Sequence, residues 1–263
     1  TFVVDVTKKK FYFVAKNGSN SNDGSEAHPW ATMEYASATA DSSNYVYIKK
    51  GTYSIPEFAI EATYCRRFMA YPGDTVKINS TATNKATIWI NGGINALFQG
   101  FDFDGNNKRW LFCINLYTKY LIFRNNTMHN IGSTDNQNPA AIFFYNGSKN
   151  PIIGENSHSN AVIQDNVIYD LNDPVNNSCA SVECYDVKNM LYEDNLVYDI
   201  DGAGVQDKDH GYMNTIRNNV IYDCAVRGIG LLNQGGQSDI EVCYNLVYRC
   251  PTAVVYGQET GYI

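Results

Sequence analysis

The sequence contains little leucine, little proline and few charged residues. Leu occurs 10 times and Pro 7 times in 263 residues, and charged side chains make up 18% of the chain. A helical bundle depends on strong helix formers, so the shortage of Leu argues against that class of fold. No apolar run approaches the roughly 18 residues that a membrane-spanning helix needs, and we therefore expect no membrane insertion.

Basic residues are also scarce. Lys and Arg number 20 against 27 Asp and Glu, which gives a formal net charge of -7, and the cations are scattered except for Lys8, Lys9 and Lys10. Nucleic acid binding relies on clustered cations that displace counterions, so the sequence argues against nucleic acid as a partner. Neutral ligands, or cations held by carboxylates, fit this charge, whereas an acidic substrate would need a local basic site.

The abundant residues favour an all-β protein. The chain has 31 Asn, 20 Gly and 20 Tyr, and Ile and Val together reach 40. Aromatic and β-branched side chains favour strands, whereas Asn and Gly favour turns. A mean hydropathy of -0.33 with 44% hydrophobic residues excludes a disordered chain. Seven cysteines without a CxxC pair or zinc-like spacing are expected to be mostly small buried hydrophobes.

A nine-residue phrase returns along the second half of the chain. Each copy has an apolar residue, two polar ones, Asn, two mostly apolar residues, an aromatic, a polar residue and an apolar one. The copies are FRNNTMHNI at 123–131, IQDNVIYDL at 163–171, YEDNLVYDI at 192–200, IRNNVIYDC at 216–224 and VCYNLVYRC at 242–250. FQGFDFDG at 98–105 is a degenerate earlier copy, in which Gly100 replaces a polar turn residue. A period near 25 residues is too short for a propeller blade.

Coils of this length, with three short strands and three turns, predict a right-handed parallel β-helix. The repeated Asn is expected at a stacking turn, where it adopts the left-handed conformation and its amide bonds the same residue one coil away. These ladder residues are Asn126, Asn166, Asn195, Asn219 and Asn245. The last position of the phrase then forms an inward column of Ile131, Leu171, Ile200, Cys224 and Cys250, which makes the two cysteines neighbours.

A second strand of each coil can be aligned in the same register. Its inward column is Ile142, Val182, Val205, Ile229 and Val254. Its outward side chains include Phe143, Glu183 and Gln206 in one column and Tyr145, Tyr185 and Lys208 in another. This outward face is the expected functional surface. The aromatic position of the phrase, which holds His129, Tyr169, Tyr198, Tyr222 and Tyr248, is expected to be a structural stack.

The first fifty residues differ in composition from the repeats and lack the nine-residue phrase. They predict a strand, a polar loop and a short helix at about 30–40 after Pro29, which would cover the open end of the hydrophobic core. We therefore expect a capping region at 1–50 and β-helix coils at 51–263, in one domain. An insertion falls around 132–160, and no C-terminal cap is evident. The segment from Thr1 lacks the design of a signal peptide, so we expect a mature or trimmed chain.

The motifs YFVAKNGSNSNDGSEAHPWATMEYA, VYIKKGTY, MAYPGDTVKI and the NNVIYD repeats resemble the right-handed β-helix proteins of the pectate lyase superfamily, which includes chondroitinase-B-like and alginate-lyase-like enzymes. The resemblance implies a secreted or cell-surface protein that cleaves a uronate-containing polysaccharide by β-elimination. In such lyases a Lys or Arg removes the proton next to the uronate carboxylate, and calcium neutralises that carboxylate. The resemblance points to Lys208 as the base, with Arg227 on the following coil.

Other residues around Lys208 complete the expected site. Tyr145 and Tyr185 would hold sugar rings or pack under the insertion, and Glu183, Gln206 and His210 would contact substrate. Carboxylates offer the oxygen ligands that calcium prefers. The candidates are Asp186, Asp199, Asp201, Asp207 and Asp209.

Each assignment has a structural alternative. Lys208 could form a surface salt bridge with Glu183 or Asp186, and Arg227 could be solvated or paired. His210 could be an exposed turn residue. Asp207 falls at an inward position, which indicates a bulge, a buried ion site or a strand end.

A non-enzymatic function is the second hypothesis. The sequence stops at VVYGQETGYI after a strand that continues the repeat. An uncovered coil exposes unpaired backbone groups, which promotes association. The alternative is therefore a structural, adhesive or glycan-binding surface protein that assembles through its β-helix ends or joins a neighbouring domain.

Overall fold

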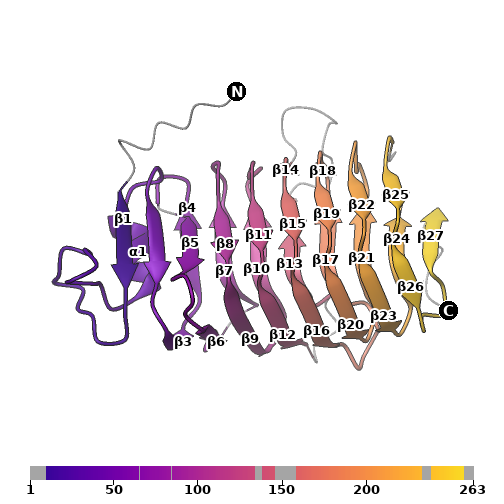
Figure 1. The fold of residues 1–263 in the computed structure, drawn as a ribbon. Coiled ribbons are helices and arrows are strands. Elements are labelled where there is room, and N and C mark those ends of the chain that lie inside the picture. The colour runs from indigo at the N-terminus through magenta and orange to yellow at the C-terminus, as the bar shows by residue number, and fades with distance from the viewer. Residues whose placement is uncertain are drawn as a thin grey trace.

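The protein is a parallel β-helix, as the repeat predicts. The computed structural model describes residues 10–64, 66–83, 85–133, 138–145, 158–232 and 238–257. Three sheets run the length of the molecule, and the coils advance from β1 at one end to β27 at the other (Figure 1). All pairings between named strands are parallel. No helix among the described residues is long and apolar enough to span a bilayer.

Each coil contributes one strand to each sheet. Sheet 1 consists of β1 (Phe11–Val14), β2 (Tyr45–Ile48), β5 (Arg67–Ala70), β8 (Leu97–Gln99), β11 (Ile122–Arg124), β15 (Val162–Gln164), β19 (Leu191–Glu193), β22 (Thr215–Arg217) and β25 (Glu241–Cys243). Sheet 2 consists of β4 (Phe58–Glu61), β7 (Ala86–Asn91), β10 (Trp110–Asn115), β13 (Ala140–Phe144), β17 (Ala180–Tyr185), β21 (Ala203–Lys208), β24 (Arg227–Leu232) and β27 (Val254–Gly257). Sheet 3 consists of β3 (Gly51–Ile55), β6 (Val76–Ser80), β9 (Phe101–Lys108), β12 (Thr127–Gly132), β16 (Val167–Asn172), β20 (Leu196–Ile200), β23 (Val220–Cys224) and β26 (Leu246–Tyr248). A small pair joins β14 (His158–Ser159) to β18 (Val187–Lys188).

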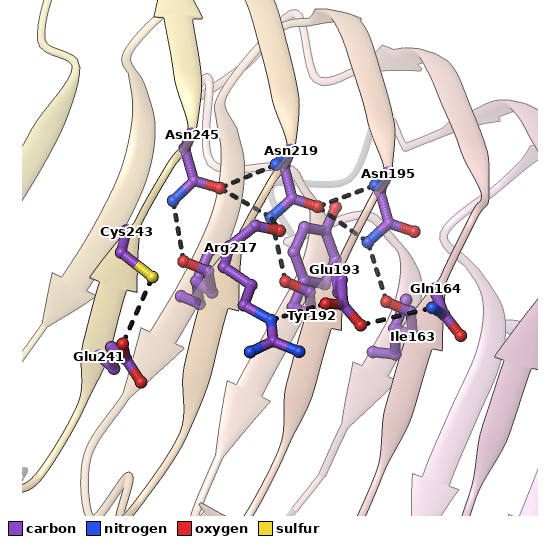
Figure 2. Close-up of polar contacts among 11 residues, drawn as sticks. Ile163, Gln164, Tyr192, Glu193, Asn195, Arg217, Asn219, Glu241, Cys243 and Asn245 are labelled. Carbon is purple, nitrogen blue, oxygen red and sulfur yellow. Dashed lines mark hydrogen bonds and ion pairs between the residues drawn. The ribbon is translucent and has the colours of Figure 1, made fainter.

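The asparagine ladder lies at the turn between sheets 1 and 3. Each side-chain amide donates to the carbonyl oxygen of the next ladder residue at 2.9–3.1 Å. The same oxygen also accepts the backbone N–H of the preceding ladder residue, and the amide donates to a backbone carbonyl of the coil before it (Figure 2). The ladder continues into the degenerate copy, where the Phe101 N–H donates to Asn126 Oδ1 at 3.1 Å.

The left-handed conformation falls one residue earlier than expected. It belongs to the residue before each ladder Asn, with φ between 53° and 56° at Asn125, Asp165, Asp194, Asn218 and Tyr244. None of the five ladder asparagines has a positive φ. Gly100 occupies the same turn position with φ 83°. The preceding residue therefore reverses the chain, and the ladder Asn can point its amide at the next coil.

The core lies inside the coils, and the expected inward columns are confirmed except at the last coil, where Val254 pairs in register with Ile229 but is 45% exposed. Ile142, Val182, Val205 and Ile229 are fully buried and paired in register. Ile131, Leu171, Ile200 and Cys224 form a second column, against which Cys250 packs. Burial and the neighbouring Cys250 raise the pKa of the Cys224 thiol. The six described cysteines are free, and four of them are buried.

Aromatic rings stack along the outside of sheet 3, as expected. His129, Tyr169, Tyr198, Tyr222 and Tyr248 follow one another with ring centroids 4.9–5.1 Å apart and planes within 13° of parallel. The spacing matches the distance between neighbouring strands, so the column is a consequence of the repeat.

The expected capping helix is α1 (Met33–Thr39), which contacts β1 and β4 at the N-terminal end of the coils. Thr32 caps it, because its side-chain oxygen accepts the Tyr35 N–H at 3.2 Å. Met33 and Ala36 are buried, and Trp30 stacks on Tyr12 just before the helix. Most of the expected insertion around 132–160, and residues 258–263 at the C-terminus, lie outside the described residues.

Candidate functional site

The outward face of sheet 2 brings several of the expected site residues together. In β17 and β21, Glu183 lies opposite Gln206, and Tyr185 lies opposite Lys208. The next coil adds Gly230 beside Gln206. Alternation along a strand sends these side chains away from the core, while Val182 and Val205 point inward.

Lys208 forms a buried ion pair with Glu183. The ammonium Nζ lies 3.0 Å from Glu183 Oε1, and the two side chains are 6% and 0% exposed. The same oxygen accepts bonds from the Tyr185 hydroxyl at 3.1 Å and from Asn138 Nδ2 at 3.0 Å. Lys208 also lies 5.6 Å from the centre of the Tyr185 ring. The structure therefore contains the ion pair that the sequence offered as the alternative role of Lys208, although it is buried rather than at the surface.

Arg227 joins this group across Gly230. A Cβ at Gly230 would lie 3.1 Å from Arg227 Cδ and 3.6 Å from Gln206 Cγ, so the absent side chain makes room for both residues. Arg227 and Gln206 are buried. Gln206 Oε1 and Glu183 Oε2 are buried acceptors with no hydrogen-bond donor among the described residues. The cluster thus combines two cations, one carboxylate and two acceptors that lack donors.

An aromatic row lies beside the charged cluster on the same face. Trp110 stacks on Phe143 with centroids 4.5 Å apart, and Phe143 contacts both Tyr145 and Tyr185 at 5.8 Å. Tyr145 is 41% exposed, whereas Tyr185 is half-buried and its hydroxyl is bound to Glu183. Burial and the Glu183 charge raise the pKa of Tyr185, so its hydroxyl remains a donor. Of the two expected sugar platforms, only Tyr145 presents an exposed ring.

His210 and Asp186 lie at the turn that follows these strands. His210 Nδ1 is 2.6 Å from Asp186 Oδ1, and the Asp186 side chain is buried. Asp186 and Asp209 occupy equivalent left-handed positions after β17 and β21, with φ of 55° and 59°. His210 is therefore a bound residue rather than a freely exposed turn residue.

The five expected calcium ligands lie in three separate places. Asp186 and Asp209 follow sheet 2, while Asp199 and Asp201 lie at the end of β20 in sheet 3, where Asp201 accepts the Asp173 N–H at 3.0 Å. Asp207 points inward, in register between Cys184 and Leu231, and no bulge interrupts its strand. No group of three or more His, Cys, Asp or Glu among the described residues is arranged to hold a metal ion. The five carboxylates therefore do not come together as one calcium site.

The sequence did not point to several members of the site. Asn138 donates to Glu183, and its backbone carbonyl accepts from Trp110 Nε1 at 2.8 Å. Arg109 lies 3.8 Å from the centre of the Trp110 ring. His158 is buried and bonds the Tyr145 carbonyl at 3.1 Å, and burial lowers its pKa. Trp110 does lie at an outward position of its coil, but Asn138 and His158, the latter in β14, lie outside the repeated phrase.

The fold defines a parallel β-helix protein, and comparisons with known proteins show that it is similar to polysaccharide lyases. No family model matches the sequence. Among curated proteins, pectate lyase L of Dickeya dadantii (strain 3937) is 25% identical over 175 residues, which cover 59% of this chain and 38% of that protein. Pectate lyase L of Dickeya chrysanthemi is 26% identical over 106 residues, or 40% of this chain and 22% of that protein. The matches thus span well under half of these relatives.

Solved structures support the same fold. XylC in complex with xylose aligns with a TM-score of 0.62 at 12% identity, covering 93% of this chain and 63% of that one. Pectate lyase Pel9A aligns with a TM-score of 0.56 at 14% identity, covering 92% and 70%. A rhamnogalacturonan lyase aligns with a TM-score of 0.51 at 17% identity, covering 84% and 70%. At these identities the likeness shows the fold alone.

Proposed function

We propose that this protein is carbohydrate-active and that the outward face of sheet 2 cleaves a uronate-containing polysaccharide by β-elimination. The observation that carries the proposal is a local excess of positive charge on an acidic protein. Among the described residues, Lys208 and Arg227 lie on this face with the Glu183 carboxylate, and Arg109 lies over the neighbouring Trp110. A polyanion needs such a basic site on a chain of net charge -7.

The residues of this face divide the reaction between them. Arg227 pairs with the uronate carboxylate and stabilises the negative charge that develops next to it. Lys208 is the base of the proposed reaction and acts in its neutral form, after losing a proton to solvent, on the same outward face as Arg227. The neutral amine takes the proton next to the carboxylate. The electron pair of the broken C–H bond forms the new double bond, the bond to the leaving glycosidic oxygen breaks, and that oxygen takes a proton from solvent.

The surrounding residues orient the substrate in this proposal. Glu183 and Gln206 are buried and support Lys208 and Arg227 from below, and the exposed ring of Tyr145 stacks on a sugar ring. Asp186 fixes the ring of His210 at the edge of the site.

A calcium requirement remains a prediction from the resemblance, to be tested by chelation, and no step of this reaction runs through a metal. A secreted or cell-surface location is part of the same proposal.

Lys208→Ala is expected to lower the rate of β-elimination by about 10²- to 10⁴-fold, the usual contribution of a positioned acid or base. The measurement is the ultraviolet absorbance of unsaturated uronate products, recorded with pectate, alginate and chondroitin as substrates, with and without calcium. Wild-type protein that forms no such product on any polyuronate would refute the lyase proposal.

A neutral double variant separates catalysis from folding. Lys208→Ala leaves the buried Glu183 carboxylate without its partner, so some activity loss could come from unfolding. Lys208→Met combined with Glu183→Gln removes both charges and should fold, as judged by circular dichroism, yet remain inactive. A folded double variant with wild-type activity would show that the pair is only structural.

The alternative proposal is a non-catalytic surface protein that binds glycans or assembles with copies of itself. It predicts binding to polysaccharide gels without product formation, and oligomers detected by light scattering. A monomeric protein that releases unsaturated products would contradict it.

A further inference from the structure

A pocket on sheet 1 lies far from the Lys208 cluster. It has a volume of about 540 Å³ and is lined by Phe11, Phe13, Glu26, Tyr47, Tyr71 and Pro72. Two of its walls come from β1 and β2, which form the N-terminal edge of sheet 1 (Figure 1). Lys208 belongs to β21 of sheet 2, toward the opposite end of the molecule. The pocket is shallow and open toward solvent, so a ligand would lie on its surface rather than inside it.

Aromatic rings form a preorganised apolar wall. Register places Phe13 opposite Tyr47, and their rings stack at 5.8 Å. Phe11, two residues before Phe13 on the same strand, also stacks on Tyr47 at 5.9 Å, and Tyr71 meets Tyr47 edge-on at 5.8 Å. Phe11 remains 48% exposed. Because each ring is held by its neighbours, little side-chain freedom is lost when a ligand binds.

Polar groups converge on one edge of this wall. Glu26 Oε1 accepts bonds from the Tyr71 hydroxyl at 2.8 Å and from Lys49 Nζ at 3.3 Å. The Glu26 side chain is 52% exposed, which leaves its second oxygen open to solvent. The Tyr71 bond lowers the pKa of Glu26, and the same bond raises the pKa of Tyr71. The pocket therefore offers a strong acceptor beside a hydroxyl that keeps its proton.

Charge decides which class of ligand fits. The Lys49 ammonium already lies 5.5 Å from the centre of the Phe13 ring and 5.3 Å from that of Tyr71, where a cationic ligand would bind. Lys49 and Glu26 also neutralise each other, so the described residues around the pocket offer no excess charge to attract an anion. An uncharged ligand with an apolar face and several hydroxyl groups satisfies both the rings and the carboxylate.

We propose that this pocket binds an uncharged sugar residue of a glycan, with its C–H face against the aromatic wall and its hydroxyl groups donating to Glu26. The site is separate from the face of sheet 2 and does not depend on its activity. In a chain that also acts on a polyuronate, it would hold a neutral part of the same polymer and raise the effective concentration of the chain to be cleaved.

Calorimetric titration with neutral oligosaccharides of xylose, galactose and arabinose tests this proposal on the whole chain. At least one should bind, and Phe11→Ala and Glu26→Gln should each raise its Kd about tenfold, from the loss of an aromatic contact or a charged acceptor. Tyr256→Ala on β27 removes an exposed ring elsewhere and should leave the Kd unchanged.

Two results would overturn the proposal. One is the absence of binding by every neutral oligosaccharide at millimolar concentration. The other is an equal Kd for the wild type, Phe11→Ala and Glu26→Gln, with all three folded by circular dichroism. Lys208→Ala should keep the binding of neutral sugars, so a failure of the lyase proposal would leave this measurement unaffected.

Discussion

Asn195→Ala is expected to lower the free energy of unfolding by about 2–6 kcal/mol. The substitution removes the acceptor of the Asn166 N–H, bonded at 3.0 Å, and the donor to the Ile163 carbonyl, bonded at 2.9 Å (Figure 2). Both backbone groups lie at the ladder turn, and each buried group left without a partner costs about 1–3 kcal/mol. Urea unfolding followed by circular dichroism measures the loss.

Position along the ladder provides the control. Asn245 accepts hydrogen bonds from Asn219 in the same way. It is only partly buried, so water can take the place of some of these hydrogen bonds when its side chain is removed. Asn245→Ala should therefore cost less than half as much as Asn195→Ala. Equal losses at positions 195 and 245 would contradict a ladder whose strength comes from buried hydrogen bonds.

The fold was predictable because three independent features of the repeat indicate it. The ladder Asn, the inward Ile and Val columns and the stacked tyrosines recur at fixed places in every coil, so each coil confirms the register of the next. The error at the turn has a simple origin. Both Asn and Asp tolerate the left-handed conformation. Because two such polar residues stand next to each other in the phrase, the sequence could not show which of them takes the positive φ. Only the backbone shows that Asp194 turns the chain and Asn195 bonds across it.

The site was less predictable because its contacts do not repeat. The register of sheet 2 correctly placed Tyr185 opposite Lys208 and Glu183 opposite Gln206. The sequence could not show that Asn138, from a turn without a repeat, donates to Glu183. Nor could it show how deeply the ion pair is buried. Proximity in sequence was also misleading for the carboxylates, since Asp207 and Asp209 flank Lys208 but point to different environments.

Asp207→Asn is expected to stabilise the protein at neutral and alkaline pH. Burial raises the pKa of Asp207 to about 7 from 3.8, with an opposing contribution from the bond donated by Asn214 Nδ2 at 2.8 Å. Because the folded state holds this proton more tightly than the unfolded state, the contribution of Asp207 to stability is greatest below pH 4. This contribution to the free energy of unfolding decreases as the pH rises from 4 to about 7, and it stays constant above pH 7. Three pKa units correspond to a penalty on the order of 4 kcal/mol at pH 8.

The amide keeps the shape of the carboxyl and its bond from Asn214, but it cannot ionise. The unfolding free energy of Asp207→Asn should therefore match that of the wild type near pH 4 and exceed it increasingly up to pH 7, as measured by urea unfolding across this range. Asp239→Asn is the control, because it replaces an exposed carboxyl at a residue with a positive φ. This variant should retain the wild-type pH dependence of stability. If Asp207→Asn destabilises the protein at pH 8, the carboxylate is a required charge rather than a tolerated buried one, as it would be if it held a cation. A stability difference that does not change with pH would show that Asp207 does not titrate in this range.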